Sequence, residues 1–138
     1  MSKRIEYKGV TLLRPIVPPP TDPNAPKTEE YLDATFAGFV TFAEPLRIDQ
    51  EAAFEDAQAA AKAIIDRGNR GPASIMQAAL PGIFACVEKW ELAKIPAQPS
   101  LETWPIRPRV QIASLFSWLM EKITAIYTDS VEPTAPNA

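Results

Sequence analysis

Proline clusters divide this chain into segments that can fold and segments that cannot join a helix or a sheet. Fifteen of the 138 residues are proline, about twice the usual share of about 5%. Six of them lie between Pro15 and Pro26, four lie between Pro96 and Pro108, and two more fall in the C-terminal sequence VEPTAPNA. Because proline lacks a backbone N–H and restricts the residue before it, we expect three foldable blocks between these clusters.

The first block predicts two β-strands. The sequence RIEYKGVTLL alternates around Lys8-Gly9, which is typical of a short hairpin or a single edge strand over about residues 4–13. The sequence TFAGFVTFA places its large apolar residues on one face and predicts a strand over about 35–43 that pairs with the first. The proline-rich segment 14–30 joins the two, and we expect it to be an exposed, partly extended loop.

The second block begins with an alanine-rich helix over about residues 49–67. Asp49 is a suitable N-cap and Gly68 a suitable C-terminal stop. Alanine makes up most of the apolar stripe of this helix, which implies that a neighbouring helix approaches closely.

A second helix is predicted over about residues 72–95, and its apolar residues keep helical spacing through Pro81. Either Pro81 kinks one long helix, or Leu80 ends a short helix and Pro81 begins another; the unbroken spacing favours the kink. Cys86 lies in the apolar sequence IFACV, which is typical of a small buried residue rather than of a reactive thiolate.

The last block predicts a hydrophobic helix over about residues 108–128. Beyond it, residues 129–138 have little apolar surface to bury, and we expect a disordered tail. The sequence therefore predicts one domain over residues 1–128. We expect an α+β fold that is mainly helical, with a short N-terminal β-hairpin or strand pair packed on three to four helices.

The composition excludes most catalytic chemistry. The chain has no histidine and one cysteine, so it lacks an imidazole base, a histidine-dependent nucleophile, the usual zinc ligands and an internal disulfide. Its carboxylates are spread along solvated segments, with no pair in apolar sequence that would raise one pKa. We expect no catalytic, cofactor or metal site and a protein that is not an enzyme.

Nucleic-acid and membrane binding are also disfavoured. The net charge is −3, and we find no basic patch that would bind a phosphate backbone. The sequence Gly68-Asn69-Arg70-Gly71 matches the GXXG loop of KH domains, but a helix end, a turn and a helix start explain it without a ligand. No segment resembles a signal peptide or a membrane span, so we expect a cytoplasmic protein.

The tryptophans indicate binding to other proteins. Trp90, Trp104 and Trp118 all lie in the C-terminal half. We expect Trp104 to anchor a connector in the core, while Arg107 and Arg109 are solvated or paired. A domain this small does not readily bury three tryptophans, so exposed aromatic surface should contact a protein partner or a second copy. The residues expected to form that surface are Phe84, Trp90, Phe116, Trp118 and Leu119.

The order of these features resembles that of the small tail assembly chaperones of long-tailed bacteriophages. The features are the strand pair beginning RIEYKGVTLL, the acidic helix around AAFEDAQAAAKAI, the tryptophan-bearing helix FACVEKWELAKIP, a proline-containing connector, the last helix SLFSWLMEKITAIY and a tail. The resemblance implies a non-enzymatic protein that binds the helical tape-measure protein and helps to recruit tail-tube subunits in the host cytoplasm.

Two other functions fit the same sequence. One is a structural virion protein, such as a head-tail connector or minor tail component, whose proline-rich segment orders on neighbouring subunits. The other is a small regulatory module that binds a host protein.

Overall fold

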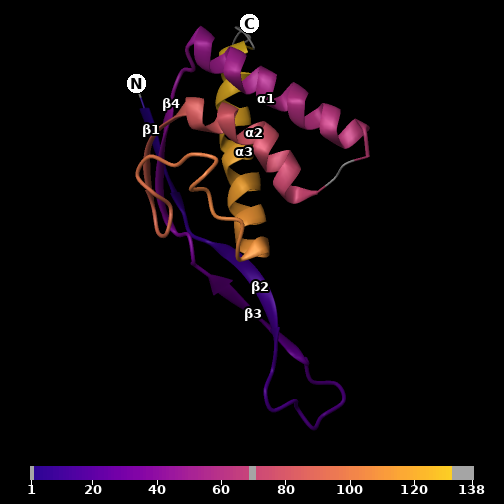
Figure 1. Ribbon diagram of the computed structural model, residues 1–138. Helices are drawn as coiled ribbons and strands as arrows, with labels where there is room; N and C mark the ends of the chain where they lie inside the picture. The colour runs from indigo at the N-terminus through magenta and orange to yellow at the C-terminus, as the bar shows by residue number, and fades with distance from the viewer. Residues whose placement is uncertain (1, 69–70, 132–138) are drawn as a thin grey trace, which may run out of the picture.

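A sheet and a group of helices form the body of this protein, and a β-hairpin projects from the body (Figure 1). The computed structural model describes residues 2–68 and 71–131. The body sheet is antiparallel and has the strand order β1-β4-β5. Its strands are β1 (Ser2–Tyr7), β4 (Gly38–Ala43) and β5 (Val87–Leu92). The hairpin consists of β2 (Val10–Pro15) and β3 (Thr28–Asp33), and the helices are α1 (Ile48–Asp66), α2 (Pro72–Cys86) and α3 (Arg109–Val131).

The predicted fold class is wrong. We expected a mainly helical α+β domain with one strand pair on three to four helices, whereas the described residues form three helices and five strands in two antiparallel sheets. Two strands account for the difference. β3 begins inside the segment 14–30 that we expected to be a loop, and β5 replaces the end of the helix expected over 72–95.

Four of the strands form one long antiparallel ribbon that is interrupted in its middle. β1 pairs with β4 as far as Tyr7 opposite Gly38, and β2 pairs with β3 from Val10 opposite Asp33. Between these pairs, two residues on one strand face four on the other. The expected pairing of the first strand with 35–43 is therefore confirmed, but the ribbon continues beyond it as a hairpin, which we call the arm (residues 10–33).

The arm tip contains most of the first proline cluster. Residues 16–27 have no regular secondary structure, and the backbone N–H of Ile16 donates to the carbonyl of Lys27 across the neck of the tip at 3.0 Å. Pro15 is the last residue of β2, so the prolines end the strand pair but do not prevent it from forming. The predicted loop over 14–30 therefore includes the end of β2 and the beginning of β3, and the loop itself covers residues 16–27.

The helical hairpin of α1 and α2 is packed very closely, as the alanine-rich stripe predicted. Figure 1 shows the two helices side by side, with α2 also contacting α3. A Cβ atom on buried Gly82 would lie 2.6 Å from Cβ of Ala57 and 3.0 Å from the carbonyl oxygen of Ala53. α1 ends at Asp66, and Gly68 just beyond it has a φ of +85°, which suits a glycine stop. Asn69 and Arg70, the middle of the GXXG match, lie outside the described residues.

The second helix is continuous through Pro81 but much shorter than predicted. α2 ends at Cys86, and β5 follows without a loop. The spacing of apolar residues predicted a helix up to residue 95 because Trp90 falls on the apolar face of such a helix. Trp90 is buried in the strand as well, where it lies opposite Val40 of β4, so its burial does not distinguish the two structures. Cys86 has no exposed surface, as expected, and burial is the main cause that raises the pKa of its thiol to about 11.

The last helix supplies the centre of the core. One face of α3 is buried to at least 98%, and its members are Ile112, Leu115, Leu119, Ile123 and Ile126. Trp118 connects α3 to the sheet, since its ring centroid lies 5.0 Å from that of Tyr7 and 5.9 Å from that of Phe42. We predicted a disordered tail from residue 129, but α3 continues to Val131, so the prediction is wrong for residues 129–131. Residues 132–138 lie outside the described part.

The contact at Gly82 yields a test of the helical packing. We expect Gly82→Val to lower the free energy of unfolding by about 2–3 kcal/mol, because the added side chain overlaps Ala57 and the backbone of α1. Gln77→Val, at an exposed position of the same helix, should cost only about 0.5 kcal/mol through lower helix propensity. Urea unfolding of both variants measures the difference, and equal losses would show that α1 and α2 are not closely packed.

Candidate protein-interaction surface

The arm exposes apolar side chains on one face. Leu13 and Leu32 are 67% and 58% exposed. Leu32 lies opposite Thr11, two residues from Leu13, so the two leucines are diagonal neighbours on the same face. Glu30 lies directly opposite Leu13 and belongs to this face as well. The arm therefore offers an apolar patch with one carboxylate beside it.

The opposite face of the arm is held together by its own side chains. Arg14 forms an ion pair with Glu29 at 2.8 Å, and its guanidinium lies 5.0 Å from the ring centroid of Tyr31. Tyr31 and its strand neighbour Leu12 are half-buried. This face has partners within the chain, whereas the described residues leave the leucine face more than half exposed.

Asp33 fixes the base of the arm to α3. Its carboxylate accepts hydrogen bonds from the backbone N–H and the hydroxyl of Thr35, and from Nε2 of Gln111 at 2.6 Å. These bonds, that of the Thr35 hydroxyl first, hold the pKa of Asp33 below its ordinary value of 3.8. Opposite, Gly9 has a φ of +109°, and a Cβ there would lie 2.3 Å from the carbonyl oxygen of Asp33. The arm can leave the sheet at this point only because residue 9 is glycine.

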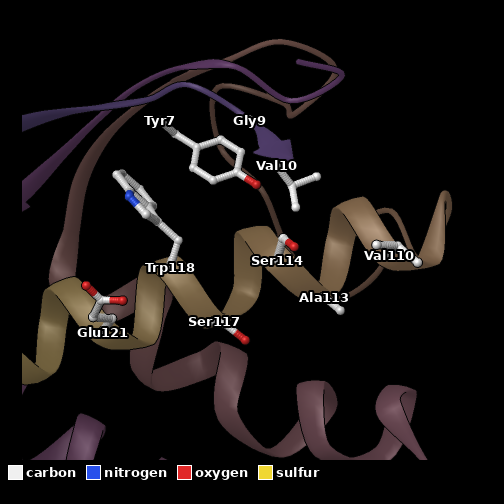
Figure 2. A pocket seen from close by; sticks show the side chains of 9 residues that line it. All are labelled: Tyr7, Gly9, Val10, Val110, Ala113, Ser114, Ser117, Trp118 and Glu121. Carbon is white, nitrogen blue, oxygen red and sulfur yellow. The ribbon is translucent and has the colours of Figure 1, made fainter. Parts of the chain in front are cut away.

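A groove of about 470 Å³ lies between the root of the arm and α3. Figure 2 shows Tyr7 and Val10 facing α3 across this groove, with Trp118 beside Tyr7. The α3 side also carries Ser114 and Ser117. We call it the strand-side groove; its lining mixes apolar and hydroxyl groups, which suits contacts that are partly polar.

A second groove, of about 390 Å³, lies on the other side of the same helix turn and is mainly apolar. Met76 and Ala73 of α2 form one wall, and Ile106, Arg109 and Val110 form the other. Ile106 and Val110 are each 54% exposed. A shallower extension of about 220 Å³ continues from it towards Leu101 and Trp104. We call the groove and its extension the helix-side groove.

Of the five residues predicted to form the interaction surface, two lie in the core and three are half-buried against it. Leu119 has no exposed surface and Trp90 is 9% exposed, so neither offers a surface in the folded chain. Phe84, Phe116 and Trp118 are half-buried against the core. The structure brings Phe84 and Trp90 together, with ring centroids 6.1 Å apart, but Trp118 packs against Tyr7 and Phe42 instead. Only Trp118 lines one of the grooves described above.

The tryptophans are covered because they stack on one another and on the sheet. Trp104 is 6% exposed, and its ring lies 5.6 Å from that of Trp90 and 5.8 Å from that of Phe84. The expected anchoring of the connector by Trp104 is confirmed. Trp90 and Trp104 are buried in this way, because large rings can pack edge to face in a small core. Trp118 is only half-buried and lines the strand-side groove, so the exposed aromatic surface that we expected is limited to this one tryptophan.

Sequence reasoning missed the residues that do expose apolar surface. Leu12 and Leu13 are adjacent apolar residues in a predicted strand, so one of them had to face away from the core. That signal was available for the arm. Val110 was indistinguishable from the buried residues of α3 by spacing, because a broad apolar stripe does not show which edge is left uncovered.

The described residues show little that is typical of a catalytic centre. Within residues 2–68 and 71–131, no group of three or more cysteine, aspartate or glutamate side chains is placed to hold a metal ion. Over the same residues, no helix is both long and apolar enough to cross a membrane.

Arg107 and Arg109 are exposed and form no ion pair in the described part of the chain.

Comparison of the chain with family models, with curated proteins and with solved structures found no match in any of the three.

The attachment of the arm is testable through Asp33. We expect Asp33→Ala to increase the motion of β2 and β3, because the hydrogen bonds to Thr35 and Gln111 are lost. The measurement is ¹⁵N relaxation of the arm amides, with order parameters falling throughout both strands. Asp22→Ala removes a bond to the backbone of Asn24 at the arm tip and should loosen only the tip.

Acid should have the same effect on the wild-type chain. Since the pKa of Asp33 is lowered in the folded state, its contribution to stability is complete above about pH 4 and is lost as the pH falls through the lowered pKa. Arm order parameters that do not change on acidification or in the Asp33→Ala variant would show that α3 does not hold the arm.

Proposed function

We propose that this protein works by binding other proteins during the assembly of a larger structure, and not by catalysis. The observation that carries the proposal is the arm, which presents Leu13 and Leu32 more than half exposed on a hairpin outside the body. An isolated two-stranded hairpin is marginally stable in water. An arm of this kind gains stability when its apolar face is covered by a partner.

Within this class, we propose that the chain is a bacteriophage tail assembly chaperone that binds the tape-measure protein and helps to recruit tail-tube subunits in the host cytoplasm. An amphipathic client helix needs an apolar groove to bind, and the helix-side groove beside Ile106 and Val110 supplies one. The arm adds a second apolar contact surface. No reactive group is required for this role.

The order of features that suggests this family is only partly kept in the structure. The strand at the N-terminus is present as β1 with its continuation β2, the acidic helix as α1 and the hydrophobic last helix as α3. The segment FACVEKWELAKIP is half helix and half strand, since α2 ends at Cys86. The proposal therefore depends on the apolar surfaces more than on the order of elements.

A structural virion protein is the second candidate, and the arm favours it. A neighbouring subunit can bind an extended segment by strand pairing and side-chain contacts, and residues 10–33 form such a segment outside the body (Figure 1). In this case the protein would remain in the finished particle, as a head-tail connector or a minor tail component.

Co-expression tests the chaperone proposal. We expect the full chain to keep its proposed client, a tape-measure protein, soluble, and the double variant Leu13→Ser/Leu32→Ser to lose most of this effect. Ile48→Ser is the matched control, because Ile48 is 88% exposed and lies on neither the arm nor a groove. A tape-measure protein that stays insoluble with the wild-type chain would contradict the chaperone role.

Mass spectrometry of purified particles separates the two candidates. A chaperone should be absent from finished virions, whereas a structural protein should be present in a fixed copy number. Absence from the virion together with no effect on the tape-measure protein would contradict both.

A further inference from the structure

We propose that the leucine face of the arm in one copy of this chain docks into the helix-side groove of a second copy. The inference rests on the proposed function, because it names the first protein partner of the arm as the chain itself. Its basis is that the two surfaces match in apolar character and in charge.

The leucine face of the arm is largely uncovered by the described residues of its own chain. Leu13 and Leu32 are 67% and 58% exposed although they lie side by side on a strand pair. Figure 1 shows the arm leaving the body near the start of α3 and pointing away from the helices. In this conformation the arm points away from its own helix-side groove, so a contact between the two surfaces would come from a second copy.

The groove surface has the complementary shape. Its volume is about 390 Å³, and its rim carries Ile106 and Val110, each 54% exposed, above Met76, which is buried. A concave site lined by aliphatic side chains suits branched aliphatic side chains from a partner. Two leucines at diagonal positions of one hairpin present such a pair together.

The charges also complement each other. On the arm, Glu29 is paired with Arg14, but Glu30, which shares the leucine face, forms no ion pair among the residues described. On the groove, Arg109 forms part of the lining and has no ion-pair partner in the same residues. Docking of the leucines would bring the carboxylate of Glu30 towards the guanidinium of Arg109. These two groups are suited to charge-assisted hydrogen bonds.

The arm and the groove are different surfaces, so the interface is head-to-tail. Each copy uses its arm on one neighbour and its groove on another, and such contacts produce either a closed ring or an open filament. Both are forms that an assembly protein uses. A symmetric dimer, in which arm meets arm, makes a different prediction for the variants described next.

Sedimentation velocity of complementary variants tests this arrangement. The arm variant is Leu13→Glu/Leu32→Glu and the groove variant is Ile106→Glu/Val110→Glu; all four side chains are more than half exposed, so the fold should be kept. We expect the wild-type chain to associate beyond a dimer as its concentration rises. Each variant alone should associate at least about thirty-fold more weakly, the loss that hot-spot residues cause.

The mixture of the two variants gives the sharpest result. The intact arm of the groove variant can dock into the intact groove of the arm variant, and then neither molecule has a further functional surface. An equimolar mixture should therefore form a dimer and nothing larger. A groove variant that still dimerises by itself would indicate arm-to-arm contact and would overturn the inference.

A charge exchange provides a second test that does not disturb the apolar residues. Glu30→Arg and Arg109→Glu should each weaken self-association, and the two changes in one chain should restore it. Glu6→Arg, on the exposed outer face of β1, is the control and should have little effect. No rescue by the double change would show that Glu30 and Arg109 do not meet.

The outcomes separate this inference from the proposed function. A wild-type chain that is monomeric at its highest soluble concentration overturns the inference, and the function still stands if that monomer keeps the tape-measure protein soluble or occurs in virions. Head-to-tail association with no effect on that client and no presence in virions confirms the inference and contradicts both proposed roles.

Discussion

The chain turns at Gly9, and the division of one β-ribbon into a sheet and an arm depends on that turn. A side chain at this position would collide with the carbonyl oxygen of Asp33, and the backbone has a positive φ that favours glycine. On the facing strand, the carboxylate of Asp33 is held by Thr35 and by Gln111 of α3. The direction of the arm is thus fixed from both strands, by backbone conformation on one and by hydrogen bonds on the other.

One face of α3 packs in the core of the body, and another face lines the strand-side and helix-side grooves. Its buried face, represented by Leu115 and Leu119, has no exposed surface. Its first turns instead leave Val110 more than half exposed, with the strand-side groove on one side and the helix-side groove on the other. Ile106 and Val110 therefore add exposed apolar surface close to the root of the arm, while other exposed apolar residues, such as Ile48 and Ile65 of α1, lie elsewhere.

The sequence predicted those elements whose pattern has one interpretation. The alanine stripe of α1, the stop at Gly68, the burial of Cys86 and the helix around Leu115 follow from local rules and are confirmed. β5 could not be distinguished from a helix, because Trp90 is buried in either, and only pairing with β4 decides it. The arm was not predicted, because its prolines indicated a loop. The adjacent Leu12 and Leu13 nevertheless required one apolar side chain to face outward. Of the predicted interaction residues, Trp90 and Leu119 are buried in the core, which is a tertiary effect that spacing does not show. Contact of Phe84, Phe116 and Trp118 with a partner stays a prediction.

We propose that the arm is a contact surface that stays uncovered until a partner binds, and hydrogen-deuterium exchange of the full chain measures this. In a dilute monomer, the amides of β2 and β3 should exchange much faster than those of β1 and β4, although all four strands belong to one ribbon. When the chain self-associates or binds its client, the arm amides should become protected while those of β1 and β4 change little. Arm amides that are as protected as the body sheet in the dilute monomer, or that stay unprotected in the assembled state, would contradict the account.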